Sequence, residues 1–275
     1  MNKIKLIACD MDGTLLDDNK KISEKNIEAI TRLKNSGVYF VIATGRHDSM
    51  IKSYLDQLKL EMPVISCNGA MVRNPFSDKM FASEPIDTQT VIKVADICKE
   101  TGADYHIYCK ETIYGETLTN KIFYYSELSK TLPATEEIKT VIDLDYKKFI
   151  NSTDEELYKI LAVSDNKEIL NKVQKRIVSE TGLTVAQSDK NLLDIMGNGI
   201  SKASALKTLI AKLGIKVEET AAIGDQVNDL EMIKFAGCGI AVANAVDSVK
   251  KEASFVTKNN NCENAVAEAI EKLIN

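Results

Sequence analysis

The sequence lacks the cysteine and histidine spacings that mark zinc sites and redox-active dithiols. Six cysteines are present, but no two of them form a C-x-x-C pair and no histidine pair accompanies them. This absence excludes a zinc-binding motif and a dithiol redox motif. Cys9 and Cys67 lie in apolar runs, where a reduced thiol behaves as a small hydrophobic side chain. The cysteines therefore favour a reducing, cytoplasmic environment.

The sequence also lacks a basic block and a long apolar run. Its 35 basic and 40 acidic residues give a net charge of −5 and a pI near 5.3. Because no basic patch is present to follow a phosphate backbone, nucleic acid is excluded as a partner. The start, MNKIKLIACDMDG, reaches charge too soon for a signal peptide, and no apolar run approaches the ~20 residues of a membrane span. We expect a cytoplasmic protein without membrane contact, as a monomer or small homo-oligomer.

The first and last parts of the chain alternate between short apolar runs and amphipathic segments. The 275 residues are 44% hydrophobic and 27% charged, which is ordinary for one large or two modest globular domains. Strands are predicted at 4–9, 38–43, 63–67, 220–224, 239–243 and 254–257, and helices at 23–37, 201–214 and 228–237, with a further helix to about residue 58 and one at the end. Continuous apolar strands between such helices predict an α/β fold with a Rossmann-like, doubly wound parallel sheet.

The middle of the chain has a different pattern. Helix-like segments at 90–102 and 166–182 lie among alternating strands such as DYHIYC, TIYGE, ELYKILAV and LTVAQSD. This pattern predicts an inserted α+β domain over residues 85–190, with a core formed by residues 1–84 and 191–275. In the first part, Asn68-Gly69 before AMV at 70–72 predicts a tight hairpin turn.

Two aspartates follow the first predicted strand, in the stretch CDMDGTLLD at 9–17. Side chains two residues apart on an extended chain point to one side, so Asp10 and Asp12 would project together from the carboxyl end of the strand. Ligands of open α/β sheets bind at that edge. A turn is the plain alternative, because aspartate and glycine favour turns.

Three further polar groups stand beside predicted strand or helix ends. Thr44-Gly45-Arg46 offers a hydroxyl and backbone N–H groups, which suit an anionic oxygen or an ordinary helix N-cap. Lys202 lies in the first turn of a helix, where the macrodipole disfavours a cation, so it is either solvated or needed by an anion. GDQVND at 224–229 places Asp225 at a strand end and Asp229 at a helix start, where it could also be a cap.

The order of these motifs resembles the haloacid dehalogenase-like superfamily of phosphohydrolases. DMDGTL looks like its first motif, DxDGTL, TGR like its second, Lys202 like its third, and GDQVND like its fourth, GDxxND. ISCNGA at 65–70, the insert and AVANAVDSVKKEASFVT at 241–257 look like the Cof-type branch with a large α/β cap. The chain departs from that branch at two places. Ala203 stands where the branch usually has glycine, and Glu263-Asn264 stands where it often has Asp-Gly. Neither change removes a catalytic group.

The resemblance implies a role for each motif residue. Asp10 is the implied nucleophile, which becomes a phosphoaspartate, and Asp12 the implied general acid and then base. To act first as an acid, Asp12 must have a raised pKa while Asp10 stays ionised. The implied direct ligands of Mg²⁺ are Asp10, Asp225 and the backbone carbonyl of Asp12. Asp229 is implied to act on the metal through a water molecule or to hold Lys202. The implied phosphate-binding groups come from Met11, Thr44, Gly45, Lys202 and Asn228.

The resulting hypothesis is a Mg²⁺-dependent phosphatase for a small phosphorylated metabolite, with sugar phosphates as the first guess. A phosphomutase and a non-catalytic phosphometabolite-binding protein are the alternatives. The cap is expected to set substrate choice, and Tyr105, Tyr108, Tyr114 and His106 are its most prominent polar residues. Tyrosines and histidines in alternating strands are more often packed than ligand-binding, so we expect structural roles for these four.

Overall fold

The computed structural model describes residues 3–116, 120–130, 139–143 and 145–274. The chain divides into two compact units. The first comprises Met1–Asp48, Ser53–Ala82 and Ser201–Asn275, and the second comprises Ser49–Lys52 and Ser83–Ile200.

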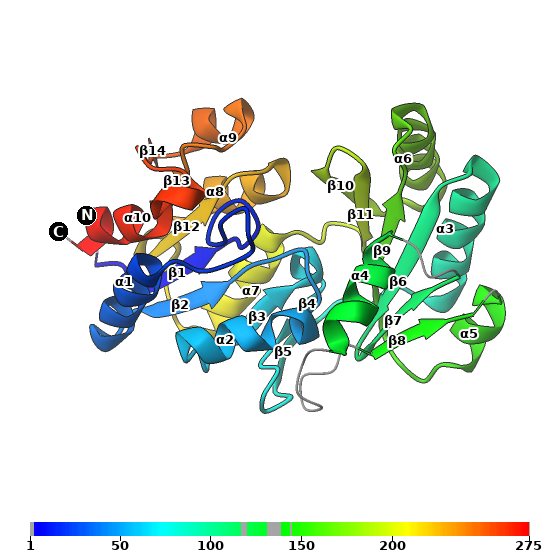
Figure 1. The fold of residues 1–275 in the computed structure, drawn as a ribbon, viewed down its shortest axis with the longest axis horizontal. Helices are drawn as coiled ribbons and strands as arrows, with labels where there is room; N and C mark the ends of the chain where they lie inside the picture. Colours follow the sequence, from blue (N-terminus) through cyan, green and yellow to red (C-terminus); the bar gives the residue numbers. More distant parts are fainter. Residues whose placement is uncertain (1–2, 117–119, 131–138, 144, 275) are drawn as a thin grey trace. The chain divides into compact units, whose positions relative to one another are not determined.

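A five-stranded parallel sheet forms the centre of the first unit (Figure 1). In spatial order its strands are β14 (Phe255–Val256), β13 (Cys238–Ala241), β12 (Thr220–Gly224), β1 (Leu6–Cys9) and β2 (Tyr39–Ile42). An isolated parallel bridge between Ala43 and Ile65 continues it toward β3 (Val64–Ser66). The predicted parallel α/β sheet is confirmed.

The strand order reverses between β1 and β12. The chain steps from β1 to β2 in one direction, and from β12 to β13 and β14 in the other. Because β-α-β crossovers are right-handed, the helices that connect consecutive strands in the two halves cover opposite faces of the sheet. Accordingly, α1 (Glu24–Asn35) packs on α10 (Ala265–Ile274), whereas α8 (Leu230–Phe235) packs on α7 (Lys202–Leu213) and α9 (Asp247–Glu252). Open α/β sheets bind ligands outside the carboxyl ends of the strands at such a reversal.

Local signals fix the ends of the helices that lead to this edge. The Ser23 side chain accepts a hydrogen bond from the Asn26 N–H and caps α1. The Ser201 side chain accepts one from the Ser204 N–H and caps α7, so that Lys202 is the first residue of that helix. Gly214 ends α7 at φ 67, in the left-handed region that glycine tolerates. The predicted helices at 23–37 and 201–214 are confirmed.

A hairpin follows α2 (Lys52–Leu58). Strand β3 pairs antiparallel with β4 (Met71–Arg73), and β5 (Met80–Ser83) completes a three-stranded sheet. The predicted hairpin turn is confirmed, but it is wider than Asn68-Gly69. Three successive residues, Cys67, Asn68 and Gly69, have positive φ angles of 49°, 54° and 103°.

A six-stranded mixed sheet forms the centre of the second unit. In spatial order its strands are β10 (Thr184–Asp189), β11 (Leu192–Met196), β9 (Leu157–Val163), β6 (Asp104–Cys109), β7 (Thr112–Gly115) and β8 (Lys139–Ile142). Only β7 and β8 pair in parallel among the described strands of this sheet. Its helices are α3 (Thr88–Thr101), α4 (Asn120–Ser129), α5 (Tyr146–Ser152) and α6 (Lys167–Thr181).

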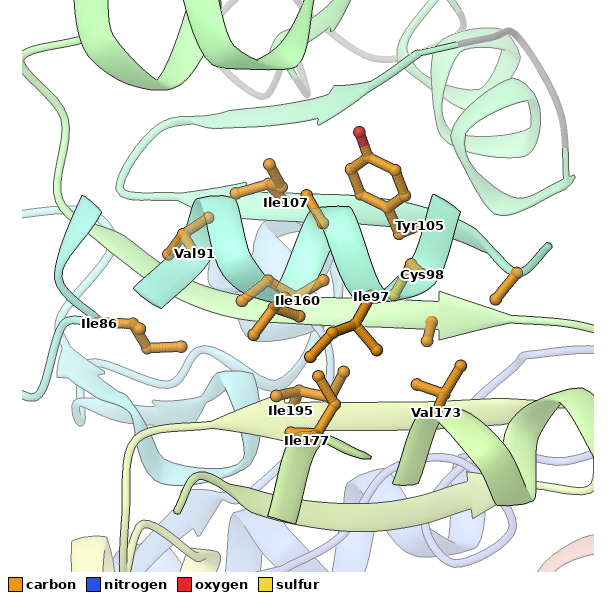
Figure 2. Packing of buried hydrophobic residues seen from close by; sticks show 14 of the residues in the cluster. Ile86, Val91, Ile97, Cys98, Tyr105, Ile107, Ile160, Val173, Ile177 and Ile195 are labelled. Atoms are coloured by element: carbon orange, nitrogen blue, oxygen red, sulfur yellow. The ribbon is translucent and has the colours of Figure 1, made fainter. Parts of the chain in front are cut away.

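Helices α3 and α6 cover one face of this sheet. Figure 2 shows Ile97 of α3 and Ile177 of α6 among apolar side chains from the strands, including Ile160 and Ile195. Strand residues contribute alternately, since Tyr105 belongs to this cluster whereas His106 does not. Tyr114 is in the cluster, and His106 and Tyr108 are also buried, at 1% and 2% exposure. The four prominent polar residues of the insert are thus all packed side chains.

The second unit ends later than the predicted insert. Strand β11 pairs with β9 and β10, so the chain leaves this unit after Ile200, whereas the sequence pattern put the second crossing after Lys190. The predicted domain limits, with a core at 1–84 and 191–275 and an insert at 85–190, stay predictions.

No helix in the described part of the chain is both long and apolar enough to span a bilayer. All six cysteines are free thiols; five are buried, and Cys262 is exposed.

Candidate active site

Three predicted aspartates meet at the carboxyl edge of the first unit's sheet. Asp10 directly follows β1 and Asp225 directly follows β12, on either side of the strand reversal. Asp229 lies one turn further on, in the 3₁₀ turn Val227–Asp229. All three side chains are buried, and one oxygen from each lies within 4.8 Å of the others. The sequence pattern put Asp10 and Asp225 at strand ends and Asp229 at a helix start, and the structure brings the three carboxylates together.

Lys202 lies between two of these carboxylates. Its Nζ donates hydrogen bonds of 2.6 Å to Asp10 Oδ1 and of 2.6 Å to Asp229 Oδ1. The ammonium is fully buried. Burial alone would lower the pKa of Lys202, but the two carboxylates outweigh burial and raise that pKa. The two buried carboxylates thus compensate the unfavourable interaction of the Lys202 ammonium with the helix dipole.

The cluster has more carboxylates than cations. Three carboxylates lie together, and the single ammonium of Lys202 contacts two of them, so their mutual repulsion is only partly compensated. Burial and then Asp229 raise the pKa of Asp10, and the same two influences raise the pKa of Asp225 to about 6. A second cation bound at the cluster would relieve this repulsion. Hard carboxylate oxygens are the ligands of Mg²⁺ and Ca²⁺, so the donor set fits a divalent metal ion.

The hydrogen bonds separate direct ligands from supporting groups. Asp229 Oδ2 accepts from the backbone N–H groups of Asp225 and Gln226, at 2.9 and 3.0 Å, while its Oδ1 accepts from Lys202. Both oxygens of Asp229 are therefore engaged. Asp225 Oδ1 accepts from the Thr14 hydroxyl at 2.8 Å. The carboxylates that could coordinate a metal ion directly are therefore Asp10 and Asp225, whereas Asp229 holds Lys202 and the turn.

Asp12 does not have the protonation state that the sequence argument required. Its carboxylate accepts two hydrogen bonds of 2.7 Å from Arg46 and one of 2.8 Å from Lys20. Burial opposes ionisation of Asp12, but Arg46 and then Lys20 outweigh it and hold the pKa of Asp12 well below its usual range.

The sequence argument expected a raised pKa for Asp12 and an ionised Asp10. The structure reverses this expectation, since the pKa of Asp10 is raised and that of Asp12 is lowered. The prediction assumed that each of the two carboxylates is the main influence on the pKa of the other. In the structure Asp10 responds mainly to burial and Asp229, whereas Asp12 responds to burial and Arg46. The expectation of a raised pKa for Asp12 is wrong for this state of the protein.

Three of the predicted phosphate-binding groups lie around Asn68. The Asn228 side-chain amide donates to Asn68 Oδ1 at 3.1 Å, and the Asn68 backbone N–H donates to the Thr44 carbonyl at 3.0 Å. A Cβ added to Gly45 would lie 3.2 Å from both polar atoms of the Asn68 amide. Thr44, Gly45 and Asn228 are thus brought together, and their phosphate-binding roles stay predictions.

Met11 is a buried side chain in the loop after β1. Its carbonyl accepts hydrogen bonds from the N–H groups of Thr14, Leu15 and Leu16, which closes the loop tightly behind Asp10. The role predicted for Met11 concerns its own backbone N–H and stays a prediction.

Sequence reasoning missed four residues of this region. They are Thr14, Lys20, Arg46 and Asn68. Arg46 stood in the TGR motif beside two predicted residues, and Thr14 stood in DMDGTL, so both carried a local signal. Asn68 stood in ISCNGA, which indicated the branch but no role at the site, and Lys20 carried no signal. Their partners Asn228 and Asp12 are brought near only by the fold.

Comparison with known proteins places the chain in a family. The family model described as haloacid dehalogenase-like hydrolase matches residues 7–270. The chain belongs to this family. It is 32% identical to the putative phosphatase YxeH of Bacillus subtilis (strain 168) over 98% of each chain. It is also 32% identical to the 5-amino-6-(5-phospho-D-ribitylamino)uracil phosphatase YcsE of the same organism, over 97% of this chain and 94% of the relative. The crystal structure of a haloacid dehalogenase-like hydrolase from Bacteroides thetaiotaomicron superposes with a TM-score of 0.83 at 30% identity, over 98% of this chain and 100% of that one.

This haloacid dehalogenase-like hydrolase is a Cof-type phosphatase with a cap domain, and its substrate class is small phosphate monoesters. The non-catalytic alternative is not kept. The structure accounts for asparagine at position 264, where the branch often has glycine. Asn264 adopts φ 70, a left-handed conformation that asparagine tolerates better than most residues.

Proposed function

We propose that this phosphatase uses Mg²⁺ and a phosphoaspartate intermediate to hydrolyse sugar phosphates or related metabolites. The observation that carries the proposal is the buried cluster of Asp10, Asp225 and Asp229 around Lys202. Three carboxylates with one ammonium would repel a phosphate dianion, whereas the same cluster with Mg²⁺ would accept it.

In the first half-reaction, an Asp10 oxygen forms a bond to phosphorus while the ester oxygen leaves with its electron pair. Covalent catalysis of this kind replaces one difficult displacement with two easier ones. Asp10 would also coordinate the metal together with Asp225 and the backbone carbonyl of Asp12. Mg²⁺, when bound, supplies charge neutralisation for the phosphoryl oxygens. In the second half-reaction, water attacks phosphorus and Asp10 is released.

Asp12 is the proposed proton carrier between the two steps. As a general base toward the attacking water, it must be ionised, and the carboxylate held by Arg46 is ionised. As a general acid toward the leaving alcohol, it must first gain a proton, which requires its hydrogen bonds with Arg46 and Lys20 to loosen when substrate binds. The acid role therefore depends on rearrangement, and the base role does not.

The transferring phosphoryl group would be held by neutral donors and one cation. We assign this role to the backbone N–H groups of Met11 and Gly45, the Thr44 hydroxyl, the Asn228 amide and Lys202. Donors placed in advance around a developing charge lower the barrier because they need no reorganisation during the reaction.

A sugar phosphate is the preferred substrate within the monoester class. The name of YcsE, at 32% identity, gives a phosphorylated ribityl compound as what that enzyme acts on. A ribityl chain and a sugar both present hydroxyl groups near the phosphate ester. We therefore place sugar and sugar-alcohol phosphates first, and nucleotide and cofactor phosphates after them.

A panel of phosphate esters tests the proposal. Purified protein with Mg²⁺ is expected to release inorganic phosphate from at least one sugar phosphate and from a generic aryl phosphate. Chelation of the metal and Asp10→Asn should each abolish the release. Absence of release from every ester would contradict the proposal. A phosphomutase, the alternative on the same scaffold, would transfer the phosphoryl group to a second hydroxyl and leave little free phosphate.

A further inference from the structure

Asn68 occupies a strained position beside three predicted site elements. Its φ of 54° and the φ of 49° at Cys67 lie in the left-handed region, which non-glycine residues rarely adopt. Strain of this kind persists only where the surrounding structure enforces it, and it is concentrated at functional sites. The turn is enforced here by backbone hydrogen bonds from Cys67 to the Arg46 carbonyl and from Asn68 to the Thr44 carbonyl.

Packing also ties this turn to the helix that carries Lys202. A Cβ added to Gly69 would lie 2.2 Å from the Ser201 carbonyl oxygen, so the turn rests directly on the N-cap of α7. The turn therefore contacts the Thr44–Arg46 segment on one side and the start of α7 on the other.

The Asn68 side chain lies between two predicted phosphate-binding groups. Its Oδ1 accepts the hydrogen bond from the Asn228 amide, and the whole amide lies against the backbone of Gly45. The residue is only 1% exposed. Yet its Nδ2 is buried with no hydrogen-bond partner in the described structure.

A buried amide nitrogen without a partner is unusual, because its desolvation is not compensated. It is reasonable at a binding site, where a ligand oxygen supplies the missing acceptor. Here the neighbours of the amide indicate which ligand, since Gly45 and Asn228 are both assigned to the phosphoryl oxygens.

We propose that Asn68 is a further substrate-binding residue, whose Nδ2 donates a hydrogen bond to an oxygen of the bound phosphoryl group. The proposal rests on the proposed function, because that function assigns Gly45 and Asn228 to the phosphoryl oxygens. It also explains why the strained turn has asparagine at its centre. Asparagine tolerates a positive φ and presents both an acceptor for Asn228 and a donor for the phosphate.

Calorimetric titration of inorganic phosphate into the Mg²⁺-loaded protein tests the proposal without requiring turnover. Asn68→Gly removes the amide and accepts φ 54° without strain, so the fold should be retained, as thermal unfolding will report. Asn68→Asp keeps the shape of the side chain and the acceptor for Asn228, but it replaces the donor with a negative charge. Asn264→Gly is the matched control, the same substitution at an asparagine with φ 70 outside the site.

We expect Asn68→Gly to weaken phosphate binding roughly 10- to 100-fold, the range for a lost hydrogen bond to a charged group. Asn68→Asp should weaken it further, and Asn264→Gly should leave it unchanged. Phosphate binding by Asn68→Gly equal to that of the wild type would overturn this proposal alone. Failure of the wild type to bind phosphate would overturn the proposed function as well.

Discussion

Replacing Lys202 with methionine removes the ammonium that lies between two buried carboxylates. The structure predicts a large loss of stability in metal-free buffer, because Asp10 and Asp229 lose their shared partner at 2.6 Å and stay buried. Breaking a buried ion pair by removing one partner costs about 3–5 kcal/mol. For a protein of this size, that corresponds to a fall in melting temperature of roughly 6–20 °C.

The pH dependence of this loss has a definite sign. In the variant, the carboxylates hold protons in the folded state that they release on unfolding, since burial and mutual repulsion raise the pKa of Asp10 and Asp225 even in the wild type. A folded state that binds more protons is favoured as the pH falls. The stability deficit of Lys202→Met should therefore be smaller at pH 5 than at pH 8.

Urea denaturation with a chelator, at both pH values, measures the effect. Lys212→Met is the matched control, because Lys212 lies on the same helix but is exposed. Added Mg²⁺ should recover part of the deficit by supplying another cation to the same carboxylates. A loss below about 1 kcal/mol, no greater than that of the control, would refute the account of Lys202 as the buried counter-ion.

Three further substitutions test the fold, one in the turn after β3, one at a buried ion pair and one at a helix cap. Gly69→Ala should lower the free energy of unfolding by at least roughly 1–3 kcal/mol, because Gly69 has φ 103° and the new Cβ would meet the Ser201 carbonyl. Urea titration measures this loss, and an unchanged unfolding midpoint would contradict the turn geometry. Arg73→Met should cost roughly 3–5 kcal/mol, because it strips a bidentate partner from the buried Asp48, and Arg73→Met with Asp48→Asn should recover part of it in the same assay. Asp87→Ala should cost about 1 kcal/mol as a lost N-cap of α3, and Asp87→Asn much less. Capping hydrogen bonds lower the pKa of Asp87, so its contribution should persist at pH 7 and fade as the pH drops below about 3.9, which melting curves of the two variants will follow.

The parts of the site that the sequence predicted are those set by strand ends. Asp10 and Asp225 directly follow buried strands, and parallel strands bring their carboxyl ends to one edge whatever the details of the loops. Lys202 was found for a related reason, because a cation at a helix N-terminus is costly unless an anion is near. Periodicity, helix caps and the polarity of parallel sheets still left a turn, a cap or a solvated lysine as alternatives, and the resemblance of the four motifs to the haloacid dehalogenase-like superfamily decided between them.

The parts that sequence missed depend on residues far apart in the chain. Arg46 meets Asp12 across the sheet edge, and this pairing reversed the expected protonation of Asp12. Strand β11 pairs with β9, although the predicted boundary after Lys190 grouped its residues with the core, because its apolar pattern suits either sheet. Nothing in the sequence around Asn68 indicates that its amide meets Asn228. Only tertiary contacts decide such cases.

The central claim is that Asp10 carries the phosphoryl group during turnover. An aryl phosphate tests it most directly, because an aryloxide leaves without a proton and Asp12→Asn should then block only the second step. Peptide mass mapping of Asp12→Asn after acid quench, in Mg²⁺, should find one phosphoryl group on Asp10, at higher occupancy than in the wild type. Turnover retained by Asp10→Asn, or an active enzyme with the phosphoryl group on another residue, would contradict the claim.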